Sequence, residues 1–295
     1  MSRVLTIRPT AKINLTLRVG PRRADGYHEV RTLMQSIALH DTVIVSERRG
    51  PFGLQCRTPG VPSDETNLAW RAAQALWTAM GRTGEVRDAH VRIDKAIPSQ
   101  AGLGGGSGNA AATLVALNTI WGGKLSRRDL IRIAATLGSD VPFFLQGGTA
   151  VATGRGEDLY PVDDVQRMGV VIIKPSFGVS TADAYRWLDE DRAAGLPESP
   201  EGRDVELGWA TGGVPLTNDL TAPVGRRHPG VQEMIAACLA EGAPGAQMPG
   251  SGSAVFGLFS EAAATRAVKQ LRRPDWLVLL TRTHGRREAV RHIGL

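Results

Sequence analysis

The glycine-rich segment 98–112 constrains this chain more than any other stretch of its sequence. From Gly102 to Gly108 it places five glycines in seven positions, and Asn109 and a run of alanines follow at once. This pattern predicts a flexible loop that opens directly into a helix. The unblocked N–H groups of the loop and the positive end of the helix would bind phosphate. The alternative is a glycine turn that only packs a helix closely on a strand.

Two familiar phosphate-binding loops do not fit the segment. A Walker A loop needs a lysine at the end of its glycine stretch, and Gly106-Ser107-Gly108 offers none. A dinucleotide fingerprint through Gly106, Gly108 and Ala111 would use Asp129 to hold a ribose. Asp129, however, lies in a segment typical of a helix start, whereas the ribose acid should end a second parallel strand. We therefore expect a phosphate loop of another kind.

Composition limits the class of protein. The chain has 295 residues, of which 42% are hydrophobic and 22% charged, and this length favours two domains. No apolar run approaches the ~20 residues needed to span a bilayer. Segment 1–8 interrupts its apolar residues with charges, unlike a signal peptide, so we expect a cytoplasmic protein with no membrane partner. The only cysteines, Cys56 and Cys238, indicate neither a disulfide framework nor a metal cluster.

The charge pattern points to small anions. A formal net charge of +6 is compatible with nucleic acid, a membrane surface or anionic small molecules. The arginines are spread along the chain without a basic block, so we do not expect nucleic acid. Only five of the 35 basic residues are lysine: Lys12, Lys95, Lys124, Lys174 and Lys269. In such a chain a lysine suggests a site that needs a compact point charge, and Lys12 and Lys95 are the leading candidates.

Five residues allow either a structural or a functional interpretation. Lys12 and Asn14 share one face of a predicted strand, as a solvated exterior pair or as part of a site. Tyr27 and His28 follow a turn, and they either pack as half-buried strand residues or stack on and hydrogen-bond a planar ring. Asp140, between a helix stop and an apolar run, either caps the next turn or presents a carboxylate for chemistry.

Apolar periodicity predicts a mixed α+β chain. In the first half it indicates strands at 4–7, 9–19, 33–39, 41–46 and 90–97, with 33–39 and 41–46 continuing one sheet, and helices at 67–77, 110–121 and 127–137. In the second half it indicates strands at 170–174, 254–259 and 276–281 and helices at 181–191, 231–241 and 262–271. This order suits a split βαβ layout with helices on one face of an antiparallel sheet. We also expect a polar, mobile loop at 193–203. The glycine/serine turn 248–253 is either a tight hairpin or a source of backbone donors near the first loop.

Three motifs make the chain resemble the GHMP small-molecule kinases: Pro9–Leu15, Pro98–Ala112 and Met248–Phe259. The resemblance covers nearly the whole chain, and segments 25–28 and 137–144 are similar to members whose acceptor carries a cytosine. It implies a two-domain α+β fold. Residues 1–164 would form an ATP-binding domain that is ribosomal protein S5 domain 2-like, and residues 165–295 a ferredoxin-like (split βαβ) domain.

The resemblance also implies a role for each motif residue. Asp140 would be the catalytic base and Lys12 its cationic partner at the reacting hydroxyl. Tyr27 and Tyr185 would sandwich the cytosine, and His28 would hydrogen-bond it. Asn14 would touch the hydroxyl or phosphate region of the substrate. The implied ATP-binding residues are Asn67, Lys95, Pro98, Gly102, Leu103, Gly104, Gly105, Gly106, Ser107 and Gly108.

The implied reaction transfers phosphate from ATP, with Mg²⁺, to the 2-hydroxyl of a cytidine diphosphate-linked methylerythritol, by a monomer or homodimer. The sequence shows no recognisable cluster of acidic residues that would bind the metal. The alternatives are another GHMP kinase, acting on homoserine, mevalonate or a sugar, and a non-catalytic relative that binds nucleotide. Two residues depart from the family pattern. Gly108 stands where Ser or Ala is usual, which would loosen the helix start and remove a hydroxyl contact to phosphate, and Pro249 stands where Thr is common.

Overall fold

The computed structural model describes residues 3–199, 204–205 and 214–295. Residues 200–203 of the polar, mobile loop expected at 193–203 lie outside the described residues, so that expectation stays open. None of the helices in the described ranges has the length and apolar character that a membrane crossing requires.

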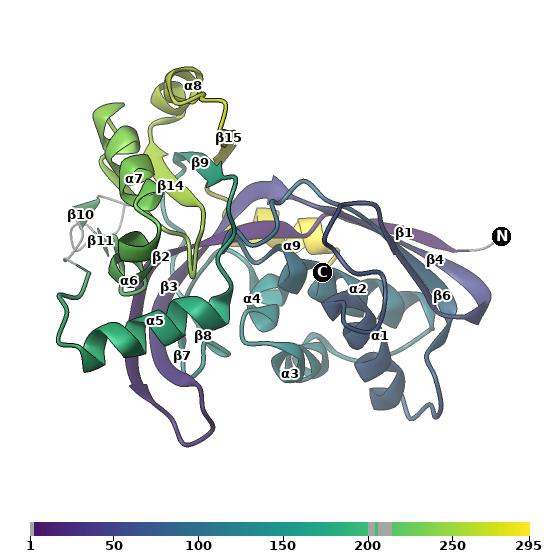
Figure 1. Ribbon diagram of the computed structural model, residues 1–295. Helices are drawn as coiled ribbons and strands as arrows, with labels where there is room; N and C mark the ends of the chain where they lie inside the picture. Colours follow the sequence, from purple (N-terminus) through teal and green to yellow (C-terminus); the bar gives the residue numbers. More distant parts are fainter. Residues whose placement is uncertain (1–2, 200–203, 206–213) are drawn as a thin grey trace.

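The first half of the chain contributes to two separate sheets (Figure 1). The four-stranded sheet has the order β1-β4-β6-β5, formed by Val4–Ile7, Thr42–Pro51, Arg87–Asp94 and Gly53–Cys56. The five-stranded sheet has the order β12-β2-β3-β7-β8, formed by Thr217–Asn218, Thr10–Arg22, His28–His40, Thr149–Thr153 and Asp158–Pro161. The expectation that 41–46 continues the sheet of 33–39 is wrong. The buried Asp41 carboxylate accepts the N–H groups of Ala96 and Ile97 and so ties the chain, where β4 begins, to the end of β6.

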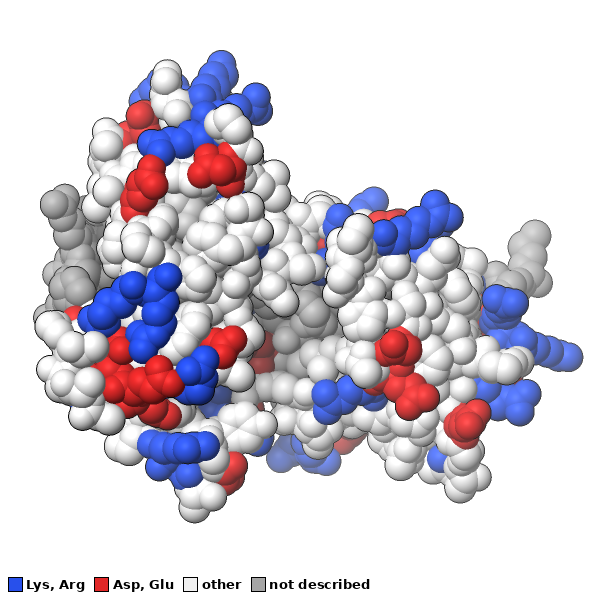
Figure 2. All heavy atoms as spheres, viewed as in Figure 1, with Lys and Arg blue, Asp and Glu red and all other residues white. Residues whose placement is uncertain are grey.

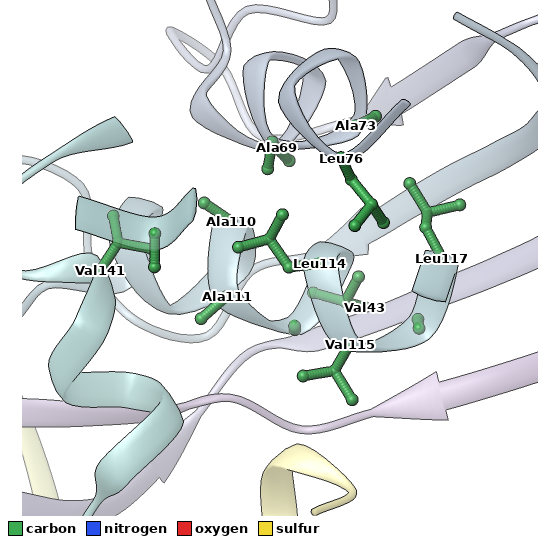
Figure 3. Close-up of a cluster of buried hydrophobic side chains, with 14 of the residues drawn as sticks. Val43, Ala69, Ala73, Leu76, Ala110, Ala111, Leu114, Val115, Leu117 and Val141 are labelled. Carbon is green, nitrogen blue, oxygen red and sulfur yellow. The ribbon is translucent and has the colours of Figure 1, made fainter. Parts of the chain in front are cut away.

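Helix α2, Gly105–Ile120, is the centre of the first hydrophobic core. It is buried on nearly every face, as its apolar sequence predicts. Ala110 and Leu114 point toward Ala69 and Leu76 of α1, Leu68–Ala79 (Figure 3). The helix includes residues 105–109, which the sequence assigned to the loop, because Gly104 with a φ of 73° already turns the chain into the first helical turn. The nearby helices are α3, Arg127–Leu137, and α4, Val141–Gln146.

The second half builds an antiparallel sheet, as predicted. Its order is β13-β14-β9-β15, formed by Gly245–Gln247, Val255–Phe259, Gly169–Pro175 and Trp276–Arg282. Helices α7, Gly230–Ala240, and α8, Glu261–Gln270, pack on one face (Figure 1). The opposite face, through Ile172 and Phe256, packs against the apolar residues of β2 and β3. The two halves therefore share a hydrophobic contact beneath β2.

Two segments from beyond residue 164 return to the first half. Strand β12 pairs in parallel with β2, and the last helix, α9 (Arg286–Ile293), packs on α2 and α4. The other elements of the second half are α5, Thr181–Ala193, α6, Thr221–Arg227, and the short pair β10, Asp204–Val205, with β11, Val214–Pro215. A domain boundary between residues 164 and 165 remains a proposal.

Candidate active site

A cleft of about 1170 Å³ lies where the three motifs converge. Its walls come from the glycine loop, the start of β2, the turn 250–252 and one face of α5. Figure 2 shows the surface hollowed between the two halves of the molecule. Lys12 and Lys95 line the cleft, whereas the other three lysines do not. The two lysines that the sequence singles out as leading candidates are therefore the two that line the cleft.

Lys12 and Asp140 meet in the cleft. The Lys12 Nζ lies 3.3 Å from Asp140 Oδ2, and their side chains are 6% and 34% exposed. The capping interpretation of Asp140 is wrong, because the residue occupies the N-cap position of α4 but its side chain makes no capping hydrogen bond. Its carboxylate is instead directed at Lys12. A buried ammonium thus faces a partly exposed carboxylate that a substrate can reach.

Asn14 fixes the position of the Lys12 ammonium. The solvated-exterior interpretation of this pair is wrong, because both side chains are buried. The Lys12 Nζ donates to Asn14 Oδ1 at 2.6 Å, and Asn14 Nδ2 donates to Thr32 Oγ1 at 2.5 Å. Thr32 Oγ1 in turn donates to the carbonyl of Thr16 at 2.6 Å. This chain of bonds gives the buried polar side chains of Lys12, Asn14 and Thr32 hydrogen-bond partners.

The glycine loop is held close to Lys12 and presents the start of α2 to the cleft. A Cβ on Gly104 would lie 2.6 Å from Phe144 Cζ and 3.0 Å from Lys12 Cγ, at a φ that favours glycine. No side chain caps α2 at Gly104, so the first-turn N–H groups, including those of Gly106 and Ser107, are available at the cleft. An uncapped helix start of this kind suits an anion.

The glycine/serine turn 248–253 is both a connection and part of the site. It joins β13 to β14 and lies against the first loop, where Ser253 N donates to the Gln100 carbonyl at 3.1 Å. A Cβ on Gly102 would lie 3.3 Å from Gly252 N, so only glycine permits this approach. The Asn14 N–H also donates to the Pro249 carbonyl at 3.2 Å. Strand β2 thereby touches both glycine motifs.

The remaining residues expected to bind ATP differ in their surroundings. Lys95 lines the cleft, and its Nζ pairs with the buried Asp41 carboxylate. Asn67 also lines the cleft, where its side chain caps α1 by accepting from Ala69 N at 2.9 Å. Pro98 and every residue from Gly102 to Ser107 line it too. Gly108 does not line the cleft. A side chain at this position would point toward Pro9, Thr10 and Phe144 beneath the loop. A hydroxyl at position 108 would therefore point away from the cleft.

The residues expected to bind the cytosine also line the cleft. The His28 ring lies 5.2 Å from the Tyr185 ring between centroids, with an angle of 32° between the planes. Tyr27 is 56% exposed, and the Arg155 guanidinium lies 5.2 Å from its ring centroid. Burial raises the pKa of the Tyr185 phenol, with the charges of Asp140 and Asp219 acting in the same direction. Tyr27, His28 and Tyr185, which the family resemblance implies as cytosine-binding residues, all line this cleft.

Sequence reasoning gave no role to several other residues of the cleft, and three of them make polar or ring contacts there. They are Asp189, which contacts His28 Nε2 at 2.8 Å, Arg155 over Tyr27, and Ser251, whose hydroxyl lies 3.0 Å from that of Thr181. Asp189 carried a usable signal, because it follows Tyr185 by four positions in a predicted helix and so shares its face. No group of three or more His, Cys, Asp or Glu that could hold a metal occurs in the described ranges.

Family models match both halves of the chain. Residues 67–148 match the GHMP kinases N terminal domain, and residues 202–274 match the GHMP kinases C terminal domain. A 4-diphosphocytidyl-2-C-methyl-D-erythritol kinase of Pelotomaculum thermopropionicum is 42% identical over 294 residues, covering 96% of this chain and 99% of the relative.

Solved structures agree with the family models. A crystal structure of 4-(cytidine 5'-diphospho)-2C-methyl-D-erythritol kinase is 34% identical, with a TM-score of 0.77 over 97% of this chain and 100% of its own. A homoserine kinase from Cytophaga hutchinsonii shares the fold at 18% identity, with a TM-score of 0.66 over 97% of this chain and 96% of its own. The two-domain α+β fold expected from the sequence is confirmed.

Proposed function

The chain belongs to the GHMP kinases, and from this membership we propose that it transfers the γ-phosphate of ATP to the 2-hydroxyl of 4-diphosphocytidyl-2-C-methyl-D-erythritol. This is a step of the non-mevalonate route to isoprenoid precursors. The geometry that carries the proposal is the Lys12–Asp140 pair, 3.3 Å apart beside the uncapped start of α2. The acceptor hydroxyl, the Asp140 carboxylate and the phosphates of ATP can meet there.

The chemistry needs no enzyme nucleophile. The hydroxyl oxygen of the acceptor attacks the γ-phosphorus, its proton passes to the Asp140 carboxylate, and the bond from phosphorus to the β–γ bridging oxygen breaks to release ADP. The Lys12 ammonium offsets the negative charge that develops on the transferring group. The backbone N–H groups at 104–107 hold the ATP phosphates.

We include Mg²⁺ in this proposal because the transferring phosphates of ATP need a cation. Mg²⁺ binds one or two protein oxygens together with substrate phosphates, so a cleft that offers the Ser107 hydroxyl and the Asp140 carboxylate fits it without an acidic cage. The Ser107 hydroxyl would hold it with the phosphate oxygens. When bound, the ion supplies positive charge to the phosphate oxygens.

The acceptor assignment rests on the aromatic residues that line the cleft. Tyr27 and Tyr185 offer aromatic faces to a planar base, and His28 offers a hydrogen-bonding ring nitrogen. Homoserine and mevalonate carry no ring that would use these groups. A cytosine does, and we place it there.

The test measures ADP release by the purified protein with ATP and a panel of acceptors. We expect turnover with the cytidine diphosphate-linked alcohol and at most about a hundredth of that rate with the same alcohol lacking the nucleotide, because remote binding energy is then lost. Faster turnover of homoserine or mevalonate would assign another member of the family. Tight ATP binding with no ADP release from any acceptor would assign a non-catalytic relative.

A further inference from the structure

The His28 ring is held by a carboxylate from the other half of the molecule. His28 is the first residue of β3, and its Nε2 lies 2.8 Å from Oδ1 of Asp189 on α5. The His28 side chain is 6% exposed and that of Asp189 is 42% exposed. Within the described part of the chain, Asp189 is the hydrogen-bond partner of this ring. Both residues line the cleft, at the end where the base is proposed to bind.

Helix α5 is fixed so that Asp189 stays in place. At its start, Ser180 caps the helix by accepting from Asp183 N at 3.0 Å. Near its end, Arg192 Nη2 donates to the Val19 carbonyl of β2 at 2.7 Å. Tyr185 lies one turn before Asp189 and packs beside the same imidazole. The helix therefore presents a ring and a carboxylate to His28 as one rigid unit.

The contact decides which nitrogen of a neutral imidazole carries the proton. An ionised carboxylate can only accept hydrogen bonds, so it selects the form in which Nε2 bears the hydrogen. Nδ1 is then left with a lone pair and acts as an acceptor. Without Asp189 both tautomers are accessible, and the nitrogen that meets the ligand can carry either a lone pair or a proton.

We propose that Asp189 is a positioning residue that holds His28 in the Nε2–H tautomer and thereby selects an amino-bearing pyrimidine over one with a carbonyl at the same position. The inference rests on the proposed function, in which His28 meets the cytosine. The 4-amino group of cytosine donates to the Nδ1 lone pair. In uracil an oxygen occupies that position, and two acceptors face each other. A site built to pair with one group rejects the other because its own polar atom is left unpaired.

The experiment compares acceptors that differ only in the base, with a cytidine or a uridine diphosphate group on the same alcohol. Wild-type protein is measured beside Asp189→Asn, Asp189→Leu, Asp189→Glu and a control, Glu190→Gln. Asparagine keeps the shape but can donate as well as accept, so it no longer sets the tautomer. Glu190 is the next residue on the same helix and pairs with Arg186 and Arg227, so its variant removes the same charge without touching His28.

We expect Asp189→Asn and Asp189→Leu to lower the cytidine-to-uridine ratio of kcat/KM about tenfold or more, the effect of one hydrogen bond. The change should lie in the KM for the acceptor, with kcat and the KM for ATP within about twofold of wild type. Asp189→Glu should keep most of the wild-type ratio, and Glu190→Gln all of it. Nitrogen-15 spectra of the imidazole should show the Nε2–H form in wild type and a tautomer mixture in Asp189→Asn.

Two results overturn the inference. One is a wild-type cytidine-to-uridine ratio in Asp189→Asn and Asp189→Leu, and the other is an unchanged tautomer in their spectra. Failure of the proposed function has a different signature, because wild-type protein would then turn over neither acceptor. The nitrogen-15 spectra report the Asp189 effect on His28 in that case as well.

Discussion

Replacing Asp140 by asparagine tests the reaction chemistry with the least change in shape. The amide cannot accept the hydroxyl proton as a carboxylate does, so general-base catalysis is lost. That contribution is typically 10²–10⁴-fold, and we expect kcat to fall by this factor, about 3–5 kcal/mol of transition-state free energy. ATP binding should persist within about twofold, because the glycine loop does not use Asp140.

The variant protein should remain folded. Lys12 keeps its bond to Asn14 at 2.6 Å, and asparagine retains an oxygen that can face the ammonium. The lost ion pair involves a carboxylate that is 34% exposed, so solvent screens it and the stability loss is about 1 kcal/mol. For a chain of this size that corresponds to a fall in Tm of about 2–4 °C.

The assay is ADP release at saturating ATP and acceptor, together with calorimetric titration of ATP into each variant. Asp275→Asn serves as the matched control, since Asp275 is exposed in the turn before β15 and away from the cleft. It should keep the wild-type rate. If Asp140→Asn turned over within tenfold of wild type while folded, Asp140 would not be the base, and the role of Lys12 beside it would need another explanation.

Three further predictions address the cytosine site, the glycine loop and the stability of the fold. Tyr27→Ala should raise the KM for the acceptor about tenfold or more and leave the KM for ATP within twofold, since stacking on one aromatic face is worth about 1–3 kcal/mol. Equal changes in both KM values would place the cytosine elsewhere. Gly104→Ala should cost about 2–5 kcal/mol of unfolding free energy by urea denaturation, from the left-handed φ and a Cβ 2.6 Å from Phe144 Cζ, whereas a loss below 1 kcal/mol would contradict this packing. Burial lowers the pKa of His284 from 6.5 to about 4, so the unfolded chain binds more protons between these values and stability should fall as the pH drops from 6.5 toward 4. His284→Gln should flatten that part of the stability profile, and an unchanged slope would mean that other groups set it.

Local signals in the sequence were sufficient where a segment's neighbours are close in the chain. Helix α3 runs from Arg127 to Leu137 as predicted, because Ser126 and Asp129 form a capping box at its start and Gly138 ends it. The same capping explains why Asp129 is not a ribose ligand. The start of α2 was placed too late, since the conformation of Gly104 depends on how closely Phe144 and Lys12 pack against it.

Apolar periodicity could not predict contacts between residues that are far apart in the sequence. Nothing near Asp41 in the sequence shows that its carboxylate ties β4 to the end of β6, so the change of sheet there was missed. Asp189 and His28 are 161 positions apart, and their contact exists only because α5 packs beside the β2–β3 hairpin near its turn. The meeting of Lys12 with Asp140 was expected from a family resemblance, which carries such long-range information implicitly.

The structure explains why position 12 holds one of the few lysines. The Nζ has one amide oxygen at 2.6 Å and one carboxylate oxygen at 3.3 Å, and the stem passes so close to Gly104 that a Cβ there would lie 3.0 Å from Lys12 Cγ. A guanidinium is wider and needs partners for five N–H donors, which this space does not offer. An ammonium is a compact charge that can contact a carboxylate and a transferring phosphate at the same time. The close approach that requires glycine at position 104 therefore also favours lysine at position 12. The same packing brings the phosphate-binding backbone of the loop close to the Asp140 carboxylate.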